Sequence, residues 1–375
     1  MLDEVKDALR VRPDIRQEDA PAFSIFIPVW NGPEWLPGAI QSVLDQTYAR
    51  WELIIGDNAS DADLATLVAR FSDLRIRYHR WAEHTDIYEN FNRTVTLCNH
   101  EWLLLLCADD RLHPDCLQAM AERIIETRCI PPRLAAVMTS SRRVDSGGEL
   151  ADDSYYGLQG RRVVLDGLYD SHQWLSLSTH PGLPPWNIGS IAISRTVLDE
   201  MGSFFRPEIG LCADHELILR LGAYGNIAYV AKELLDYTVN DGSDSHFRGA
   251  QDLSSRSPVP SMAAAMISAL QSHEHRRVVS DVERAQVHRA IARWFVRRAA
   301  HHRYQVGGRG RVGAFQDLVG ATSHYPGMLI SAQMAIAVVL LIAPTELLKA
   351  SRHSRGIGLL RRLLHRFRGG TPAKA

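Results

Sequence analysis

The feature that most constrains this chain is a series of short, mostly apolar strand-like runs, of which the three clearest are each followed by a cluster that contains Gly, Asn or Asp. The clearest are Phe23–Val29 (FSIFIPV), Trp51–Ile55 (WELII) and Trp102–Cys107 (WLLLLC); further runs lie at 75–79, 134–139, 187–194 and 226–230. Stretches with helical spacing of apolar residues separate them, at 34–46, 86–98 and 213–224. Continuous apolar strands that alternate with amphipathic helices predict an α/β fold, with a mostly parallel twisted sheet flanked by helices.

Three successive strand ends carry acid or amide side chains: Asn31, Asp57 with Asn58, and Asp109 with Asp110. In open parallel sheets, ligands bind outside the carboxyl ends of the strands. One polar strand end means little, but three in succession would line one cleft. We therefore expect a ligand site at this edge of the sheet.

Asp109 and Asp110 follow a buried strand directly. Paired carboxylates suit a hard divalent cation, Mg²⁺ or Mn²⁺, which takes oxygen ligands and bridges phosphates. Two adjacent acids are also common in an ordinary solvated turn. The position after five apolar residues favours the metal interpretation.

Two further acids have a structural and a functional interpretation. Asp57 is either a turn residue or a carboxylate that accepts hydrogen bonds from a base or ribose. Asp214 opens the helix at 213–224, where the helix dipole alone favours an acid. It could equally serve as a general base for an acceptor hydroxyl. His215 and Glu216 are the local rivals for that role.

Composition changes along the chain suggest three parts: a flexible N-terminal arm (1–20), a main domain (21–250) and a helical C-terminal region (251–375). Within the main domain, residues 145–185 are rich in Gly, Asp and Pro, and we expect loops there.

The distribution of charge and the number of cysteines indicate which partners and which cellular compartment to expect. The segment Lys349–Ala375 carries eight Lys or Arg and no acid, which leaves 34 basic and 43 acidic residues in the body. An acidic body argues against nucleic acid as a partner. Five cysteines without a CxxC pair, and no N-terminal apolar run, suggest a reducing cytoplasm.

Two C-terminal segments bear on membranes. Gly327–Ala343 has 17 residues without a charge, which is short for a span, so we expect a buried or membrane-surface helix. Ile357–Phe367 resembles a basic amphipathic helix able to lie on an anionic membrane, although a solvated helix fits equally. The expected location is the cytoplasm, with peripheral contact at the inner face of the cytoplasmic membrane.

Four stretches, in this order, resemble the family 2 inverting glycosyltransferases with their A-type nucleotide-sugar-binding fold. They are Phe23–Asn31, Ser42–Ser60, Asn90–Asp110 and Ala213–Ser245. The resemblance implies transfer of a sugar from a nucleoside diphosphate sugar, with a UDP-sugar as the first candidate, to an acceptor hydroxyl with inversion. It also suggests bacterial surface polysaccharide or lipopolysaccharide synthesis, with a glycan or lipid-linked acceptor.

The resemblance implies a role for each matching residue. Asp214 would be the catalytic base. The nucleotide sugar would be bound by Pro28, Val29, Asn31, Asp57, Asn92, Arg93 and Asp109. A divalent cation, Mg²⁺ or Mn²⁺, would be held by Asp109, Asp110 and Asn240. Residues near an acceptor would be Trp186, Asn187 and His215, although an aromatic side chain such as Trp186 is also a common core residue.

This chain departs from the family pattern at two positions. Cys107 stands where many members have an acid, and Asn240 stands where many have His. These differences bear on metal binding and leave a catalytically weak nucleotide-sugar or carbohydrate-binding relative as an alternative. A sugar nucleotidyltransferase is a second alternative, but the turn after the first strand lacks the basic, Gly-rich phosphate loop such enzymes use. No GxGxxG follows any strand, which disfavours a dinucleotide dehydrogenase.

Overall fold

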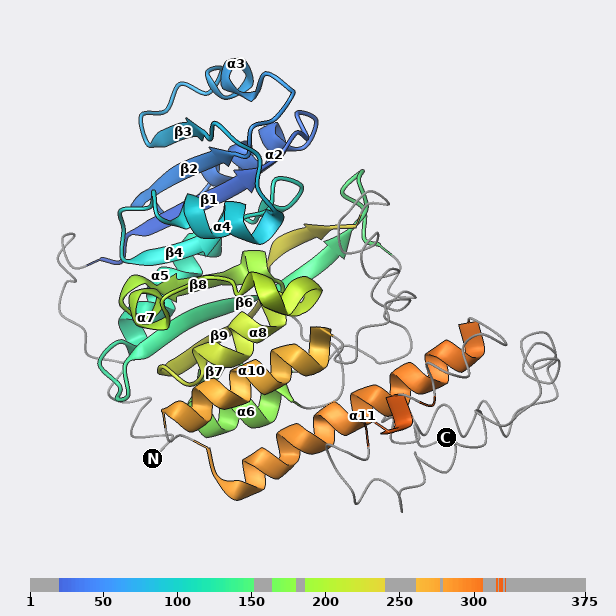
Figure 1. The fold of residues 1–375 in the computed structure, drawn as a ribbon. Helices are drawn as coiled ribbons and strands as arrows, with labels where there is room; N and C mark the ends of the chain where they lie inside the picture. Colours follow the sequence, from blue (N-terminus) through green and yellow to red (C-terminus); the bar gives the residue numbers. More distant parts are fainter. Residues whose placement is uncertain are drawn as a thin grey trace, which may run out of the picture.

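The computed structural model describes residues 20–151, 164–179, 186–239, 261–276 and 279–305, with a few more between 315 and 321. A nine-stranded sheet flanked by helices forms its body (Figure 1). The strands are β1 (Phe23–Val29), β2 (Trp51–Asp57), β3 (Ile76–Arg80), β4 (Trp102–Leu105), β5 (Arg111–Leu112), β6 (Leu134–Val144), β7 (Gly167–Tyr169), β8 (Ile191–Ser194) and β9 (Asn226–Thr238). The α-helices are α2 (Leu36–Leu44), α3 (Leu64–Val68), α4 (Ile87–Val95), α5 (Cys116–Thr127), α6 (Ser171–Ser178), α7 (Arg195–Met201), α8 (Ala213–Leu221), α10 (Ser261–His275) and α11 (Asp281–Gln305), and the short 3₁₀ turns are η3 (Ile188–Ser190) and η4 (Pro207–Cys212).

The sheet has a parallel half and a mixed half. Its order is β3-β2-β1-β4-β8-β6-β9-β5, with β7 paired to β9. Strands β3, β2, β1 and β4 are parallel, whereas β8 runs antiparallel to both β4 and β6. The predicted α/β class with flanking helices is confirmed. The antiparallel pairs, which the apolar pattern does not reveal, make the second half mixed.

The alternation of side chains along β1 builds a core on each face of the sheet. Ile25 and Ile27 pack into one apolar cluster with residues of α2 and α5. Phe26 points to the other face and joins residues of α7 and α8. Both faces of the central strands are therefore covered, which explains why most residues of these strands are apolar.

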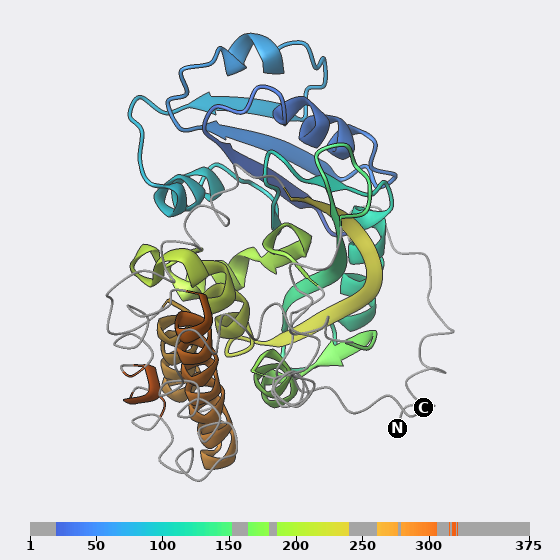
Figure 2. The same cartoon turned by 90° about the vertical axis from the view of Figure 1, so that its right-hand side faces the viewer.

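Two helices beyond the main sheet pack against its flank. Helix α10 contacts α8 and α11, and α11 contacts α6 (Figure 2). Among the described residues, none of the helices combines the length and apolarity needed to cross a bilayer. The N-terminal arm up to residue 19 and the segments Gly327–Ala343 and Ile357–Phe367 lie outside the described residues.

The expectation of loops throughout 145–185 is wrong. The structure describes β7 at Gly167–Tyr169 and α6 at Ser171–Ser178 within that stretch. Helix α6 begins with a capping box formed by Asp170 and Gln173, and it buries Trp174 against the sheet. The large Trp174 side chain supplies much of the contact that holds α6 in place. The helix therefore has few other apolar residues, and its apolar pattern in the sequence is weak.

Candidate functional site

The parallel strands bring their polar ends to one edge of the sheet. Val29 at the end of β1 pairs with Asp57 at the end of β2. On the other side of β1, Leu105 of β4 pairs with Phe26, and the chain then continues into the turn at 107–110. The convergence predicted for these strand ends is present in the structure.

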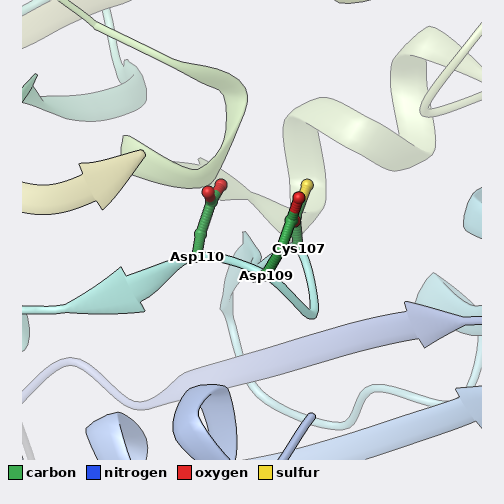
Figure 3. A group of neighbouring side chains, drawn as sticks. All are labelled: Cys107, Asp109 and Asp110. Atoms are coloured by element: carbon green, nitrogen blue, oxygen red, sulfur yellow. The ribbon is translucent and has the colours of Figure 1, made fainter. Parts of the chain in front are cut away.

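The turn after β4 gathers three side chains that could hold a metal ion. One ligand atom each of Cys107, Asp109 and Asp110 lies within 4.8 Å of the others. Figure 3 shows the three side chains extending from the turn on the same side. The backbone N–H of Asp110 donates to the Cys107 carbonyl over 3.1 Å, which closes the turn.

Asp110 has no exposed surface, and its carboxylate is only partly satisfied. Its Oδ1 accepts a hydrogen bond of 2.9 Å from the Thr238 backbone N–H, at the end of β9. Its Oδ2 has no hydrogen-bond partner among the described residues. Burial, followed by the charge of Asp109, raises the pKa of Asp110 well above its usual range. An orphaned buried carboxylate oxygen is a group that a cation would compensate.

Several charges near this turn affect the pKa of the Cys107 thiol. Burial raises its pKa, and three carboxylates add to that effect: Asp110, Asp109 and Asp214. Asp214 is separated from Cys107 by more than a hundred residues in the chain, yet it lies close enough for its charge to act on the thiol. The predicted metal site and the predicted base therefore occupy one neighbourhood.

Asp214 lies in the first turn of α8 and remains accessible. Its side chain is 39% exposed, and that of His215 is 38% exposed. Burial of Asp214 would raise its pKa, but the charge of His215 and the hydrogen bonds from His215 outweigh that effect and lower it. His215 donates its backbone N–H to Asp214 Oδ1 over 2.7 Å, and its Nδ1 lies 3.1 Å from the same oxygen. Asp214 is therefore held as a carboxylate, with His215 beside it.

Helix α8 is anchored by a buried ion pair. Glu216 and Arg220 are both 0% exposed, and Arg220 Nε lies 3.0 Å from the Glu216 carboxylate. Arg206 also reaches Glu216 Oε1 over 3.0 Å. Ser268 of α10 donates to the same oxygen over 3.1 Å, so the helix that carries Asp214 is fixed from outside the sheet.

Asp57 is fully buried, and protein groups satisfy its carboxylate. Its Oδ1 accepts from the Ser60 N–H over 2.8 Å. Its Oδ2 accepts from Tyr78 Oη over 2.5 Å and from Arg80 Nη1 over 2.9 Å. Burial would raise the pKa of Asp57, but these hydrogen bonds lower it. The Asp57 carboxylate is therefore bound by protein groups, and it connects the end of β2 to Ser60, Tyr78 and Arg80.

Asn31 joins the two loops that follow β1 and β2. It adopts a positive φ of 56°, which suits the tight turn after Trp30. Its Oδ1 accepts from Asp61 N over 2.9 Å, and its own N–H donates to Ser60 Oγ over 2.8 Å. The neighbouring Pro28 and Val29 are buried, and the Val29 carbonyl accepts a hydrogen bond of 2.8 Å from the Asn58 N–H.

Helix α4 packs tightly behind β2. A side chain at Gly56 would meet Thr94 Oγ1 at 2.2 Å, so only glycine permits this approach. Helix α4 thereby places Arg93 beside Asn58, whose Oδ1 accepts a hydrogen bond from Arg93 Nη2. The guanidinium also lies over the Trp81 ring at 4.6 Å. Arg93 is thus held at the edge that carries Asp57.

Asn92 turns away from that edge. Its Nδ2 donates to the Phe205 carbonyl over 3.0 Å, and its Oδ1 accepts from the Phe205 N–H over 2.8 Å. Both halves of the amide are used to fasten α4 to the segment that precedes α8.

The candidate acceptor residues near 186 are engaged in packing. Trp186 is 6% exposed and lies between Trp174 and Tyr229, with ring centroids 5.0 and 5.8 Å away. Asn187 accepts from Gly189 N over 3.0 Å and begins η3. The burial of Trp186 fits the role of a core residue, which was the alternative to contact with an acceptor. Asn240 lies outside the described residues.

Trp30 lies within the stretch Pro28–Asn31, between residues that the resemblance assigns to nucleotide binding, and is a further candidate. Its side chain is 56% exposed, although it follows the buried strand β1 directly. It contacts the His84 ring with a centroid distance of 4.8 Å. The signal available in the sequence was a large aromatic residue placed inside a polar turn, next to Asn31.

Comparisons with known proteins agree with this geometry. Residues 24–146 match the model of the glycosyl transferase family 2. A PGL/p-HBAD biosynthesis glycosyltransferase of Mycobacterium bovis is 37% identical over 97 residues, which is 25% of this chain and 38% of that protein. A chondroitin synthase of Escherichia coli is 23% identical over 214 residues, 56% of this chain and 28% of that protein. The chain thus matches less than two fifths of the length of either relative.

Two solved structures share the fold. TarS residues 1–349 of S. aureus, in complex with UDP-GlcNAc, align with a TM-score of 0.53 and 13% identity, covering 82% of this chain and 91% of theirs. The mannosyltransferase PcManGT of Pyrobaculum calidifontis, in complex with GDP-Man and Mn²⁺, aligns with a TM-score of 0.50 and 13% identity, covering 97% of this chain and 90% of its own. At this identity the likeness concerns the fold alone.

Proposed function

Because this chain belongs to the family 2 glycosyltransferases through its residues 24–146, we propose that it transfers a sugar from a nucleoside diphosphate sugar to an acceptor hydroxyl with inversion. A UDP-sugar is the first candidate donor. The names of two relatives, in PGL/p-HBAD biosynthesis and chondroitin synthesis, support a glycan or lipid-linked acceptor. Assembly of a bacterial surface polysaccharide or lipopolysaccharide is the proposed setting.

The donor base is assigned to the end of β2. Asp57 and Arg93 lie at this edge with Asn58 between them. The exposed ring of Trp30 offers a stacking face for the base, and the buried Pro28 and Val29 supply backbone at the floor. Asn31 would keep the two loops in place around the nucleotide.

A divalent cation, Mg²⁺ or Mn²⁺, is assigned to Asp109 and Asp110. The fit rests on the orphaned buried Oδ2 of Asp110 and on the ligand atoms gathered within 4.8 Å at the turn. Asn240 is the further proposed ligand. Such an ion, when bound, neutralises the negative charge that builds on the departing diphosphate.

Asp214 is the proposed base. Its lowered pKa keeps it ionised at neutral pH, so it can accept a proton from the acceptor hydroxyl. Proton removal lets the hydroxyl oxygen attack the anomeric carbon on the face opposite the diphosphate. The bond to the diphosphate breaks as the new bond forms, and this single displacement inverts the configuration. His215, beside Asp214, would orient the carboxylate and face the acceptor.

The observation that carries the proposal is that Cys107 of the acidic turn packs in the same apolar cluster as Ala213, the neighbour of Asp214, and that the Asp214 charge helps raise the pKa of the Cys107 thiol. A base and a diphosphate-binding turn that meet, although distant in sequence, are what a displacement at the sugar between them requires.

A donor panel tests the proposal. Nucleotide sugars are screened by thermal shift with Mn²⁺, and donors that stabilise the protein are then assayed for release of the nucleoside diphosphate. In Asp214→Asn, turnover should fall by about 10²–10⁴-fold, the range for a well-placed base, while the thermal shift with nucleotide is retained. Glu208→Gln, an exposed acid on η4, is the matched control and should keep wild-type turnover.

Two outcomes would count against the proposal. An Asp214→Asn variant with near-normal turnover would remove Asp214 as the base. Binding of a nucleotide sugar without turnover of any donor would favour the alternative of a non-catalytic binding relative.

A further inference from the structure

Cys107 lies in the acidic turn, beside Asp109 and Asp110. Its Sγ is one of three ligand atoms that lie within 4.8 Å of one another, with carboxylate oxygens of Asp109 and Asp110. Figure 3 shows the sulfur and the Asp109 carboxylate side by side. A cation placed among these groups would meet a sulfur as well as oxygens.

A second, independent observation indicates that a cation belongs there. Asp110 is 0% exposed, and its Oδ2 has no hydrogen-bond partner among the described residues. This oxygen belongs to the same group of three side chains as Cys107. A buried carboxylate oxygen without a donor is stabilised when a cation occupies the site.

We propose that Cys107 is a ligand of the cation held by Asp109 and Asp110, and that its sulfur makes the centre prefer thiophilic divalent ions to Mg²⁺. The inference rests on the metal site of the proposed function and deepens it. Thiolate is a soft ligand that favours ions such as Zn²⁺ and Cd²⁺, whereas Mg²⁺ prefers all-oxygen coordination. As the sulfur–metal bond forms, the thiol proton passes to solvent and the sulfur keeps the bonding electron pair.

The other cysteines define the controls. Cys98 and Cys116 are buried in the core, 5% and 0% exposed. Cys129 is exposed, and Cys212 is partly exposed. Adventitious binding to the accessible thiol is removed by working in a Cys129→Ser background, and Cys212→Ser serves as the matched partly exposed control.

The experiment titrates Cd²⁺ alone into the full chain and follows the sulfur-to-metal charge-transfer absorption in the ultraviolet. The Cys129→Ser protein should develop this band to a stoichiometry of one, and the Cys212→Ser version should retain it. Adding Cys107→Ser should abolish the band and lower the ratio of Cd²⁺ to Mg²⁺ affinity by about tenfold or more.

A second substitution keeps the test informative if the serine variant folds poorly. Cys107→Asp supplies a third carboxylate to the turn, so the band should disappear while Mg²⁺ affinity rises. Metal affinities come from calorimetry, and thermal unfolding verifies that each variant is folded. A band that survives in both Cys107 variants, or an unchanged ratio of affinities, would overturn the proposal.

Failure of this inference can be told apart from failure of the proposed function. If the band depends on Cys107 but no nucleotide sugar is turned over, the thiol ligand stands and the transferase proposal fails. If donors are turned over with Mn²⁺ and no variant shows the band, the transferase proposal stands and the thiol ligand is rejected.

Discussion

Replacing Arg220 with Met should destabilise the protein by about 3–5 kcal/mol, the cost of breaking a buried ion pair from one side. The change would leave the carboxylate of Glu216 in the core, where both side chains are 0% exposed and 3.0 Å apart. Arg220 also donates to the carbonyls of Ser203 and Phe204 over 3.2 and 2.9 Å, and the variant would lose both bonds. Arg206 would still reach Glu216 over 3.0 Å. Because Arg206 still neutralises part of the Glu216 charge, we expect the loss of stability to stay within about 3–5 kcal/mol.

Urea unfolding measures the effect through the transition midpoint, provided the slope is unchanged. Arg133→Met is the matched control, because its pair with Glu200 is exposed by 39% and 42% and should contribute only about 0–1 kcal/mol. Adding Glu216→Gln to Arg220→Met removes the stranded charge, so the double variant should be more stable than Arg220→Met alone. If Arg220→Met lies within about 1 kcal/mol of wild type, or if the double variant is the less stable, the argument from a buried charge is wrong.

Three further predictions concern the site and the C-terminus. Because the pKa of Asp214 is lowered, kcat/KM should be retained above that pKa and lost as the pH falls through it, so the acidic limb should lie below the range of an ordinary aspartate. An acidic limb above that range would point to a different base. Trp30→Ala should raise the donor KM about tenfold with little change in kcat, since aromatic stacking on a base contributes about 1–3 kcal/mol. Trp30→Phe should restore most of the affinity. A wild-type KM for the Ala variant would contradict the stacking role. The full chain should pellet with anionic liposomes more than a version truncated near Gly327, and equal pelleting would remove the proposed membrane contact.

The parts of the fold that could be predicted from sequence are those in which a local pattern reports burial. Phe23–Val29 is apolar at every position except Ser24 because helices cover both faces of β1, and its predicted bounds are confirmed. The two-residue strand β5 and the antiparallel direction of β8 depend on partners more than 50 residues away, so no local pattern indicates them.

The candidate site was predictable in location more than in detail. The strand ends at Asp57 and Asp109 follow from the parallel order of the strands, and the sequence indicated both. The sequence does not indicate where the side-chain amide of an Asn points. In the structure, the Asn92 amide binds the backbone of Phe205. Trp30 lies in the predicted turn after β1, but no local pattern indicates that its ring is exposed.

The hydrogen bond from the Thr238 N–H to Asp110 spans 128 residues of the chain. Thr238 lies outside the family-matched segment 24–146, so a residue of that segment depends on a later strand for a hydrogen bond. A fragment cut at its end would contain the acidic turn but neither the β9 backbone that steadies Asp110 nor the helix that carries Asp214. In evolutionary terms, that segment grafted alone onto another protein would bring the acidic turn without either of these two elements.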